Sequence, residues 1–408
     1  MKCRFCKNEI SHVFIDLDKA PLSNSYLSYN QLNEPEKDYP LKVMVCEECW
    51  LVQVDEYKKS SEIFNNEYLY FSSYSRTWLE HAKQYTDTII PRLKLNSNSL
   101  VIEIASNDGY LLQYFKEKDI PCLGVEPAGN IAETARKRGI ETITDFFCTS
   151  LATELKNKNR KADLIIGNNV LAHVPDVNSF TQGLKLVLKN NGVITMEFPH
   201  LLQLVENNQF DTIYHEHFSY FSFHTVQNIF SDHGLEIFDV DEIPTHGGSL
   251  RIYARHMQNG SRSPCASVTA LIEQEKTAGI NKLSYYENFQ PKAERVKYDL
   301  LEFLKNQKKS GHMIAAYGAA AKGNTLLNYC GITKDLISFV VDASEHKQGK
   351  FLPGSHIPIL SEEHIKLSKP SFMLILPWNI KDEILHQLAY IKKWDVQFII
   401  AIPHLTVL

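Results

Sequence analysis

The sequence Asn98-Ser-Leu-Val-Ile-Glu-Ile-Ala-Ser-Asn-Asp-Gly-Tyr-Leu-Leu112 is typical of a buried strand, a tight turn and a helix. The apolar run covers residues 100–104, the turn covers 107–109, and the helix is predicted over 110–118. A second strand, over 122–126, ends on Glu126, where a carboxylate can accept hydrogen bonds from both hydroxyls of a ribose. This order predicts the nucleotide-binding half of a doubly wound α/β sheet.

The turn differs from the GxGxxG pattern of dinucleotide-binding proteins. Its first two glycine positions hold Ala105 and Asn107, and the acidic Asp108 follows. Because Asp108 would repel a pyrophosphate but not a sulfonium ion with an amino-acid tail, the turn favours S-adenosylmethionine. Further strands are predicted over residues 141–147, where an adenine could stack at the end, and from residue 162. The predicted cofactor residues are Glu103, Ala105, Asn107, Asp108, Gly109, Glu126, Pro127, Phe146, Phe147, Asn168 and Asn169.

Length and charge limit the classes of protein to consider. With 408 residues, 44% of them hydrophobic, the chain should form two or three domains. With a net charge of −5, the chain lacks the excess of basic residues that would attract nucleic acid or an anionic membrane. We found no apolar run long enough to span a bilayer and no signal peptide, so we expect a cytoplasmic protein.

Four of the eight cysteines form two CxxC pairs, Cys3/Cys6 and Cys46/Cys49. Each CxxC turn can direct two sulfurs at one ion, and two such turns complete a tetrahedron without an open position. The pairs therefore predict a structural zinc site that stabilises a small segment and takes no part in the chemistry. A redox-active dithiol is the alternative.

The segment Asp211-Thr-Ile-Tyr-His-Glu-His-Phe-Ser-Tyr-Phe221 mixes proton-sharing and bulky apolar side chains. Such a mixture is typical of a half-buried pocket wall, where imidazole and phenol groups can move protons. The alternative is a polar turn whose hydrogen bonds are all satisfied within the protein. His173 is a second candidate, because it follows the fourth strand at the carboxyl edge of the sheet.

Residues 313–327 again read as strand, Gly/Ala turn and helix, and residues 337–342 as a second strand ending in an acid. This predicts a second Rossmann-like unit after two charged helical stretches. Its lysines favour a phosphate-bearing ligand, and the alternative is a fold copy that only supports the other domain. The His246-Gly-Gly-Ser249 sequence suggests backbone close to a ligand, or else a glycine-rich hairpin turn. The predicted substrate residues are His215, His246, Gly247, Gly248, Ser249, Lys322, Asn324, Lys347 and Lys350.

Several motifs follow one another along the chain: the two CxxC pairs, SNDGYLL, NNVLAHVPD, YHEHFSYFS, HGGSLR, GAAAKGNTLL and PWN. The order of these motifs resembles that of the bacterial nucleotide-sugar C-methyltransferases. These enzymes methylate carbon 3 of a 4-keto-deoxysugar. The resemblance covers essentially the whole chain. It implies a zinc-binding module over 1–64, a class I S-adenosylmethionine domain over 65–262 and a Rossmann-like domain over 263–408, with the sugar nucleotide between the last two.

The resemblance also implies roles for single residues. His217 would be the general base, with Tyr214, Glu216 and His173 around the sugar, and Tyr68 or Tyr70 would join them. We expect Glu216 to fix the tautomer of His217, and Tyr214 and His173 to donate to the developing enolate oxygen.

Three rival functions remain at this point. The closest is an O- or N-methyltransferase acting on a sugar nucleotide. An NAD-dependent sugar epimerase should show GxGxxG and Tyr-xxx-Lys, which we found in no suitable place. A zinc-dependent, non-catalytic scaffold should carry a basic face. The nucleotide carrier, TDP or GDP, stays open.

Overall fold

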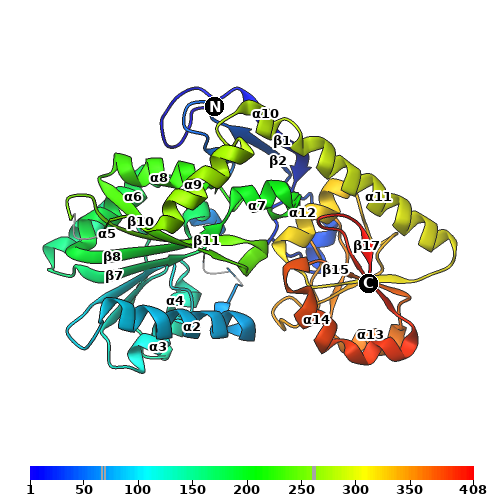
Figure 1. The fold of residues 1–408 in the computed structure, drawn as a ribbon. Coiled ribbons are helices and arrows are strands. Elements are labelled where there is room, and N and C mark those ends of the chain that lie inside the picture. The colour runs from blue at the N-terminus through cyan, green and yellow to red at the C-terminus, as the bar shows by residue number, and fades with distance from the viewer. Residues whose placement is uncertain (66–67, 69, 260–262) are drawn as a thin grey trace.

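The computed structural model describes residues 1–65, 68, 70–259 and 263–408, which form three sheets (Figure 1). The first sheet has the order β1-β2-β3-β9 and is antiparallel throughout. Three of its strands come from the N-terminal module, but β9 comes from the segment that contains His217. That segment is therefore tied to the N-terminal module by backbone hydrogen bonds. The strands are β1 (His12–Ala20), β2 (Tyr39–Val45), β3 (Val52–Val54) and β9 (Ser219–Tyr220).

The second sheet has seven strands in the order β10-β11-β8-β7-β4-β5-β6. Strands β8 to β6 run parallel, whereas β11 is antiparallel to both of its neighbours. This confirms the predicted doubly wound fold. The strands are β4 (Val101–Ile104), β5 (Cys122–Val125), β6 (Thr142–Ile143), β7 (Ala162–Asn168), β8 (Leu188–Pro199), β10 (Leu235–Ile243) and β11 (Ser249–His256).

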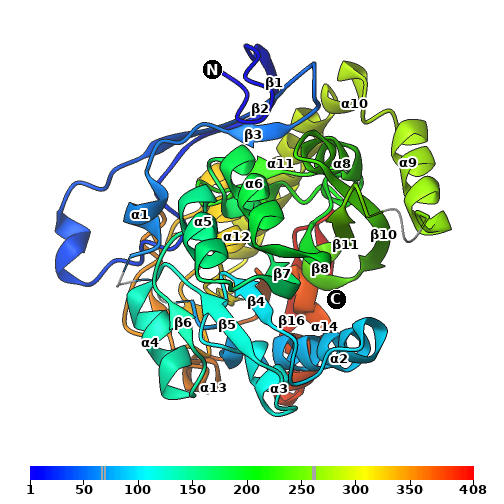
Figure 2. The same ribbon diagram turned by 90° about the vertical axis from the view of Figure 1, so that its left-hand side faces the viewer.

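Helices cover both faces of this sheet (Figure 2). The helix predicted over residues 110–118 is shorter in the structure, where α3 covers only Leu112–Lys116. The other helices in this part of the chain are α1 (Ser60–Ile63), α2 (Arg76–Leu93), α4 (Gly129–Lys137), α5 (Thr149–Asn157), α6 (Val177–Val187), α7 (Leu201–Glu206) and α8 (Phe223–Asp232).

The third sheet, in the C-terminal part, has the order β14-β13-β12-β15-β16-β17 and is parallel except for its last strand. The second Rossmann-like unit is thereby confirmed. Its strands are β12 (Ile314–Tyr317), β13 (Val340–Val341), β14 (Ile359–Leu360), β15 (Phe372–Ile375), β16 (Gln397–Ile400) and β17 (Thr406–Val407). The helices are α9 (Ala266–Ala278), α10 (Leu283–Tyr286), α11 (Phe289–Lys309), α12 (Ala321–Cys330), α13 (Glu363–Ser368) and α14 (Lys381–Gln387).

One apolar cluster joins all three parts of the chain. It contains Phe14 of β1, Phe210 before the His217 segment, and Phe289 of α11, with Phe14 stacked on Phe289 at a ring distance of 4.7 Å. Burying these rings at the junction fixes the three parts against one another. Among the described residues, no helix is both long enough and apolar enough to cross a bilayer. The domain boundaries at 64 and 262 stay predictions.

Candidate active site

A cavity of about 1710 Å³ lies where the three parts of the chain meet. Residues from the N-terminal module, from the strand ends of the seven-stranded sheet and from the C-terminal unit line it, for example Asn24, Asn168 and Lys322. Its position outside the carboxyl ends of parallel strands is the usual place for ligands in open α/β folds. The cavity is large enough to hold a cofactor and a second organic molecule together.

Most predicted cofactor residues line this cavity. They come from the turn after β4, the end of β5, the segment after β6 and the end of β7, and they are Ala105, Asn107, Glu126, Pro127, Phe146, Phe147, Asn168 and Asn169. Ala105, Asn107 and Asn169 have positive φ angles of 55°, 49° and 53°. The strand ends are therefore followed by tight turns that bring backbone to the cavity wall.

Glu126 lies at the centre of the cofactor half. Its two carboxylate oxygens accept hydrogen bonds from the backbone N–H groups of Asn107, at 3.0 Å, and Ala128, at 2.9 Å. Each oxygen keeps a second lone pair, so the carboxylate can still accept from the hydroxyls of a ribose. Burial raises the pKa of Glu126 to about 7, although both N–H groups oppose this shift.

Asn168 carries further evidence for a polar ligand. By geometry, neither polar atom of its buried side chain has a hydrogen-bond partner among the described residues, although the Tyr110 hydroxyl lies close by, and Oδ1 of Asn169 also lacks a partner. Buried amides are normally paired, so these atoms fit a ligand with its own donors and acceptors. S-adenosylmethionine, with a ribose, an adenine and an amino-acid tail, supplies such groups. The residues present therefore fit this cofactor.

Three predicted cofactor residues do not line the cavity. Asp108 forms an ion pair with Arg138 at 3.3 Å and accepts a hydrogen bond from Ser73, so its charge is used within the protein. Glu103 is fully buried, and burial raises its pKa well above the usual range. Gly109 has a φ of +79°, and a Cβ there would lie 2.4 Å from Cδ1 of Ile140, so this glycine serves the turn.

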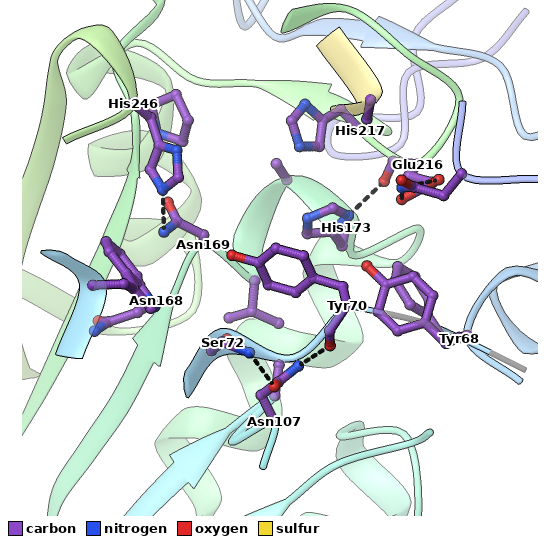
Figure 3. Close-up of a pocket in the computed structure, with 18 of the residues that line it drawn as sticks. Tyr68, Tyr70, Ser72, Asn107, Asn168, Asn169, His173, Glu216, His217 and His246 are labelled. Carbon is purple, nitrogen blue, oxygen red and sulfur yellow. Dashed lines mark hydrogen bonds between the residues drawn. The ribbon is translucent and has the colours of Figure 1, made fainter. Parts of the chain in front are cut away.

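His217 lies on the opposite wall and has a defined tautomer (Figure 3). Its Nδ1 is 2.9 Å from the backbone carbonyl oxygen of Thr212, which can only accept, so Nδ1 carries the hydrogen. Nε2 therefore has the free lone pair, and the Tyr214 hydroxyl donates to it at 2.8 Å. Burial, with the neighbouring imidazole of His173, lowers the pKa of His217 well below its ordinary value. A neutral imidazole can take up a proton at Nε2 once the hydrogen bond from Tyr214 is given up.

The prediction that Glu216 fixes the tautomer of His217 is wrong. Thr212 fixes its tautomer, whereas the Glu216 carboxylate is hydrogen-bonded to Asn24. The reason is local: the turn at residues 214–217 directs consecutive side chains to different sides. Burial raises the pKa of Glu216 to about 7, and its carboxylate still lines the cavity.

The expected donor role of His173 is also wrong. The Nδ1–H of His173 donates to the backbone carbonyl of Glu216 at 2.8 Å, and burial lowers the pKa of His173 to about 4. The ring is therefore neutral, and Nε2 presents a lone pair instead of a hydrogen. Among the groups that can donate into the cavity are the phenols of Tyr68 and Tyr70, whose hydroxyls point toward its middle (Figure 3).

The half of the cavity nearest the C-terminal unit contains three of the predicted substrate residues, His246, Lys322 and Lys347. The Nζ of Lys322 donates to Oδ1 of Asn379 at 2.7 Å and lies 4.6 Å from the Trp378 ring centroid. Burial lowers the pKa of Lys322, an effect that Asp211 opposes. An anion in this half would satisfy the buried ammonium group.

The other predicted substrate residues, His215, Gly247, Gly248, Ser249, Asn324 and Lys350, do not line the cavity. The prediction for His215 and the glycines is corrected by what they contact. Nε2 of His215 lies 3.1 Å from the carbonyl of Pro40 in β2, so this ring holds the N-terminal module. A Cβ at Gly247 would lie 2.5 Å from the Trp378 ring, so the glycine admits that indole instead of a ligand.

The predictions for Ser249 and Asn324 as substrate residues are corrected in the same way. Ser249 donates to the carbonyl of Thr245 at 2.8 Å, and Asn324 donates to the carbonyl of Ser23 at 2.6 Å. Both contacts are internal to the protein. Asn24 and Asn379 line the cavity, and Asp211 accepts a hydrogen bond from the Trp378 indole at 2.7 Å, although none of the three was predicted as a site residue. Asn379 belongs to the quoted PWN motif, and Asp211 begins the quoted His217 segment, whereas Asn24 belongs to none of the quoted motifs.

In the C-terminal unit, the turn after β12 is hydrogen-bonded to side chains of the protein itself. Asp342, at the end of β13, accepts from the backbone N–H of Ala319 at 2.7 Å. The Tyr26 hydroxyl, from the N-terminal module, donates to the carbonyl of Ala319 at 2.6 Å, and Lys347 donates to the same oxygen at 2.8 Å. The acid at the end of the second strand, which holds a ribose in dinucleotide-binding proteins, is therefore hydrogen-bonded within the protein here.

The four predicted metal ligands meet at one point. The sulfurs of Cys3, Cys6, Cys46 and Cys49 all lie within 4.8 Å of one another. Four thiols at this spacing fit a tetrahedral zinc ion and leave no open position, so the site is structural.

Comparisons with known proteins describe the same three parts. Family models match a zinc-binding domain over residues 3–64, a methyltransferase domain over 78–240 and a C-methyltransferase C-terminal domain over 244–403. C-methyltransferase NovU from Streptomyces niveus is 33% identical over 402 residues, which cover 98% of this chain and 95% of the relative. The predicted zinc module, class I methyltransferase fold and S-adenosylmethionine cofactor are confirmed.

Two solved structures are more distant. The PH0226 protein from Pyrococcus horikoshii OT3 is 15% identical with a TM-score of 0.37, over 46% of this chain and 94% of that chain. Magnesium protoporphyrin IX methyltransferase from Synechocystis PCC 6803 with bound S-adenosylmethionine is 15% identical with a TM-score of 0.33, over 48% of this chain and 88% of that chain.

Proposed function

The chain belongs to the S-adenosylmethionine-dependent C-methyltransferases, and we propose that it methylates carbon 3 of a nucleotide-activated 4-keto-deoxysugar. The observation that supports this best is the neutral His217 imidazole, whose unprotonated Nε2 is paired with the Tyr214 phenol in the same cavity as the cofactor residues. A base beside a phenol suits the removal of a proton from a carbon next to a ketone.

The proposed chemistry begins at Nε2 of His217. A carbon becomes nucleophilic when a neighbouring carbonyl can take up the charge that remains after the proton leaves. Nε2 takes the proton from carbon 3, and the Nδ1–H bond to Thr212 holds the ring while it becomes charged. Because Nε2 has a single lone pair, the Tyr214 hydroxyl must turn away from it before Nε2 can take the proton, and this hydroxyl can then donate to the carbonyl oxygen that becomes the enolate oxygen.

The rest of the site would hold the reactants together. S-adenosylmethionine, bound at Glu126, Asn168 and Asn169, supplies an electrophilic methyl group. Tyr68 and Tyr70 lie between the two halves of the cavity (Figure 3), where they can orient the sugar and exclude water. Holding both reactants at near-attack distance accounts for much of the expected acceleration.

The diphosphate of the substrate would bind near Lys322. This lysine is buried beside Trp378 and Asn379, and among the described residues it forms no ion pair. Burial lowers its pKa, so a phosphate at this point would restore the full charge of the ammonium group. Methylated sugars of this kind would serve the biosynthesis of branched-chain sugars.

The deciding experiment supplies the protein with S-adenosylmethionine carrying a ¹³C-methyl group and with TDP- and GDP-linked 4-keto-deoxysugars. We expect a product methyl signal in the C–CH₃ region of the ¹³C spectrum, with a product mass higher by one methyl group. An O–CH₃ or N–CH₃ signal instead would overturn the proposal in favour of an O- or N-methyltransferase. Lys322→Met should raise KM for the accepted substrate while the Kd for S-adenosylmethionine stays unchanged.

A further inference from the structure

We propose that Asn24, a side chain of the N-terminal zinc module, is a positioning residue that holds the Glu216 carboxylate in the methyl-transfer site. The module is thereby part of the active site as well as a zinc-stabilised attachment. The inference rests on the proposed function only in so far as Glu216 faces the substrate.

The contact joins residues that are far apart in the sequence. Nδ2 of Asn24 lies 2.8 Å from Oε1 and 2.8 Å from Oε2 of Glu216, and both side chains line the cavity. Glu216 is only 2% exposed, so water solvates its charge poorly. An amide nitrogen at this distance from both oxygens fixes the orientation of the carboxylate plane.

The other groups around Glu216 cannot replace Asn24. In the described part of the chain, no lysine or arginine forms an ion pair with this carboxylate. Burial and, to a smaller extent, the charge of Glu216 raise the pKa of three neighbouring phenols in the described part of the chain: Tyr26 from the N-terminal module, Tyr68, and Tyr214 from its own segment. All three phenols are therefore neutral. His173 contacts only the backbone carbonyl of Glu216.

Asn24 thus opposes the effect of burial. Burial raises the pKa of Glu216 to about 7, and the hydrogen bond from Asn24 lowers it. Without the amide, the carboxylate would take up a proton at a higher pH and could no longer act only as an acceptor for a substrate hydroxyl.

Asn24 is itself held by the C-terminal unit. Asn324 of α12 donates to the carbonyl of Ser23 at 2.6 Å, directly before Asn24. Tyr26 donates to the carbonyl of Ala319 at 2.6 Å, and its hydroxyl lies 3.3 Å from Oδ1 of Asn24. The loop is therefore fixed on both sides of Asn24, and the amide is preorganised to receive Glu216.

The test compares Asn24→Leu, which keeps the volume but removes the amide, with Ser25→Ala at the exposed neighbouring position. The Glu216 titration is followed by ¹³C NMR of labelled glutamate carboxyl groups, with Glu216→Gln identifying its signal. We expect its midpoint to move from about pH 7 upward by about one pH unit in Asn24→Leu, and to stay in Ser25→Ala. The pH at which kcat falls on the acid side of its pH profile should shift together with the Glu216 midpoint.

An unchanged Glu216 midpoint in Asn24→Leu, or a loss of kcat that is equal at every pH, would overturn the inference. If Asn24→Leu does not fold, Asn24→Asp decides, because a second carboxylate beside Glu216 should raise the midpoint further. The NMR titration needs no substrate. It therefore tests the role of Asn24 even if the 4-keto sugar is not methylated, and methylation with an unchanged midpoint would reject this inference alone.

Discussion

Replacement of His217 by alanine tests the proposed chemistry most directly. The change removes the imidazole whose Nε2 is paired with the Tyr214 phenol, so the step that takes the proton from carbon 3 loses its base. General-base catalysis contributes about 10²–10⁴ in rate, which corresponds to about 3–5 kcal/mol of barrier. The variant also leaves the Thr212 carbonyl and the Tyr214 hydroxyl without this partner, at about 1–3 kcal/mol of folding stability for each group that stays unsatisfied.

The assay follows deuterium at carbon 3 of the 4-keto substrate, with no methyl donor present. We expect wash-out to slow by about 10²–10⁴ in His217→Ala, while the Kd for S-adenosylmethionine, measured by calorimetry, changes little. His215→Ala is the matched control, because this ring contacts Tyr39 and Pro40 of the N-terminal module and does not line the cavity. It should lower Tm but keep wash-out per folded molecule. Unchanged wash-out in His217→Ala would refute the assignment of the base.

Three further predictions follow from single contacts. Tyr214→Phe removes the donor proposed for the enolate oxygen, so kcat should fall by about 10²–10³ with KM nearly unchanged; a fall of less than threefold, on the order of experimental scatter, would contradict this role. Because burial raises the pKa of Glu126 to about 7, its ionised fraction and the affinity for S-adenosylmethionine should both decrease as the pH falls through 7, and Glu126→Gln should remove that dependence in calorimetric titrations. Cys46→Ser removes one of four clustered thiols, so zinc content measured by mass spectrometry should fall and the free energy of unfolding should decrease by more than about 2 kcal/mol; a zinc-free variant with unchanged Tm would be the contrary result.

The sequence alone determined the features that depend on local pattern. Val101 and Ile102 begin a buried strand because a parallel strand covered on both faces must be apolar. The two CxxC pairs predicted one metal site because each pair can bring two thiols to the same ion. The positions of Ala105 and Asn107 in the turn directed the choice of cofactor, since they replace the glycines that a pyrophosphate needs.

Only the tertiary structure decided which neighbours in the sequence share a site. His215, Glu216 and His217 are consecutive, yet the first contacts β2, the second binds Asn24 and the third pairs with Tyr214. A local motif cannot reveal such partners, because Asn24 is 192 residues from Glu216 and reaches it only when the three parts pack together. The direction of each hydrogen bond was decided in the same way: the tautomers of His173 and His217 depend on which carbonyl oxygen the folded chain places beside Nδ1.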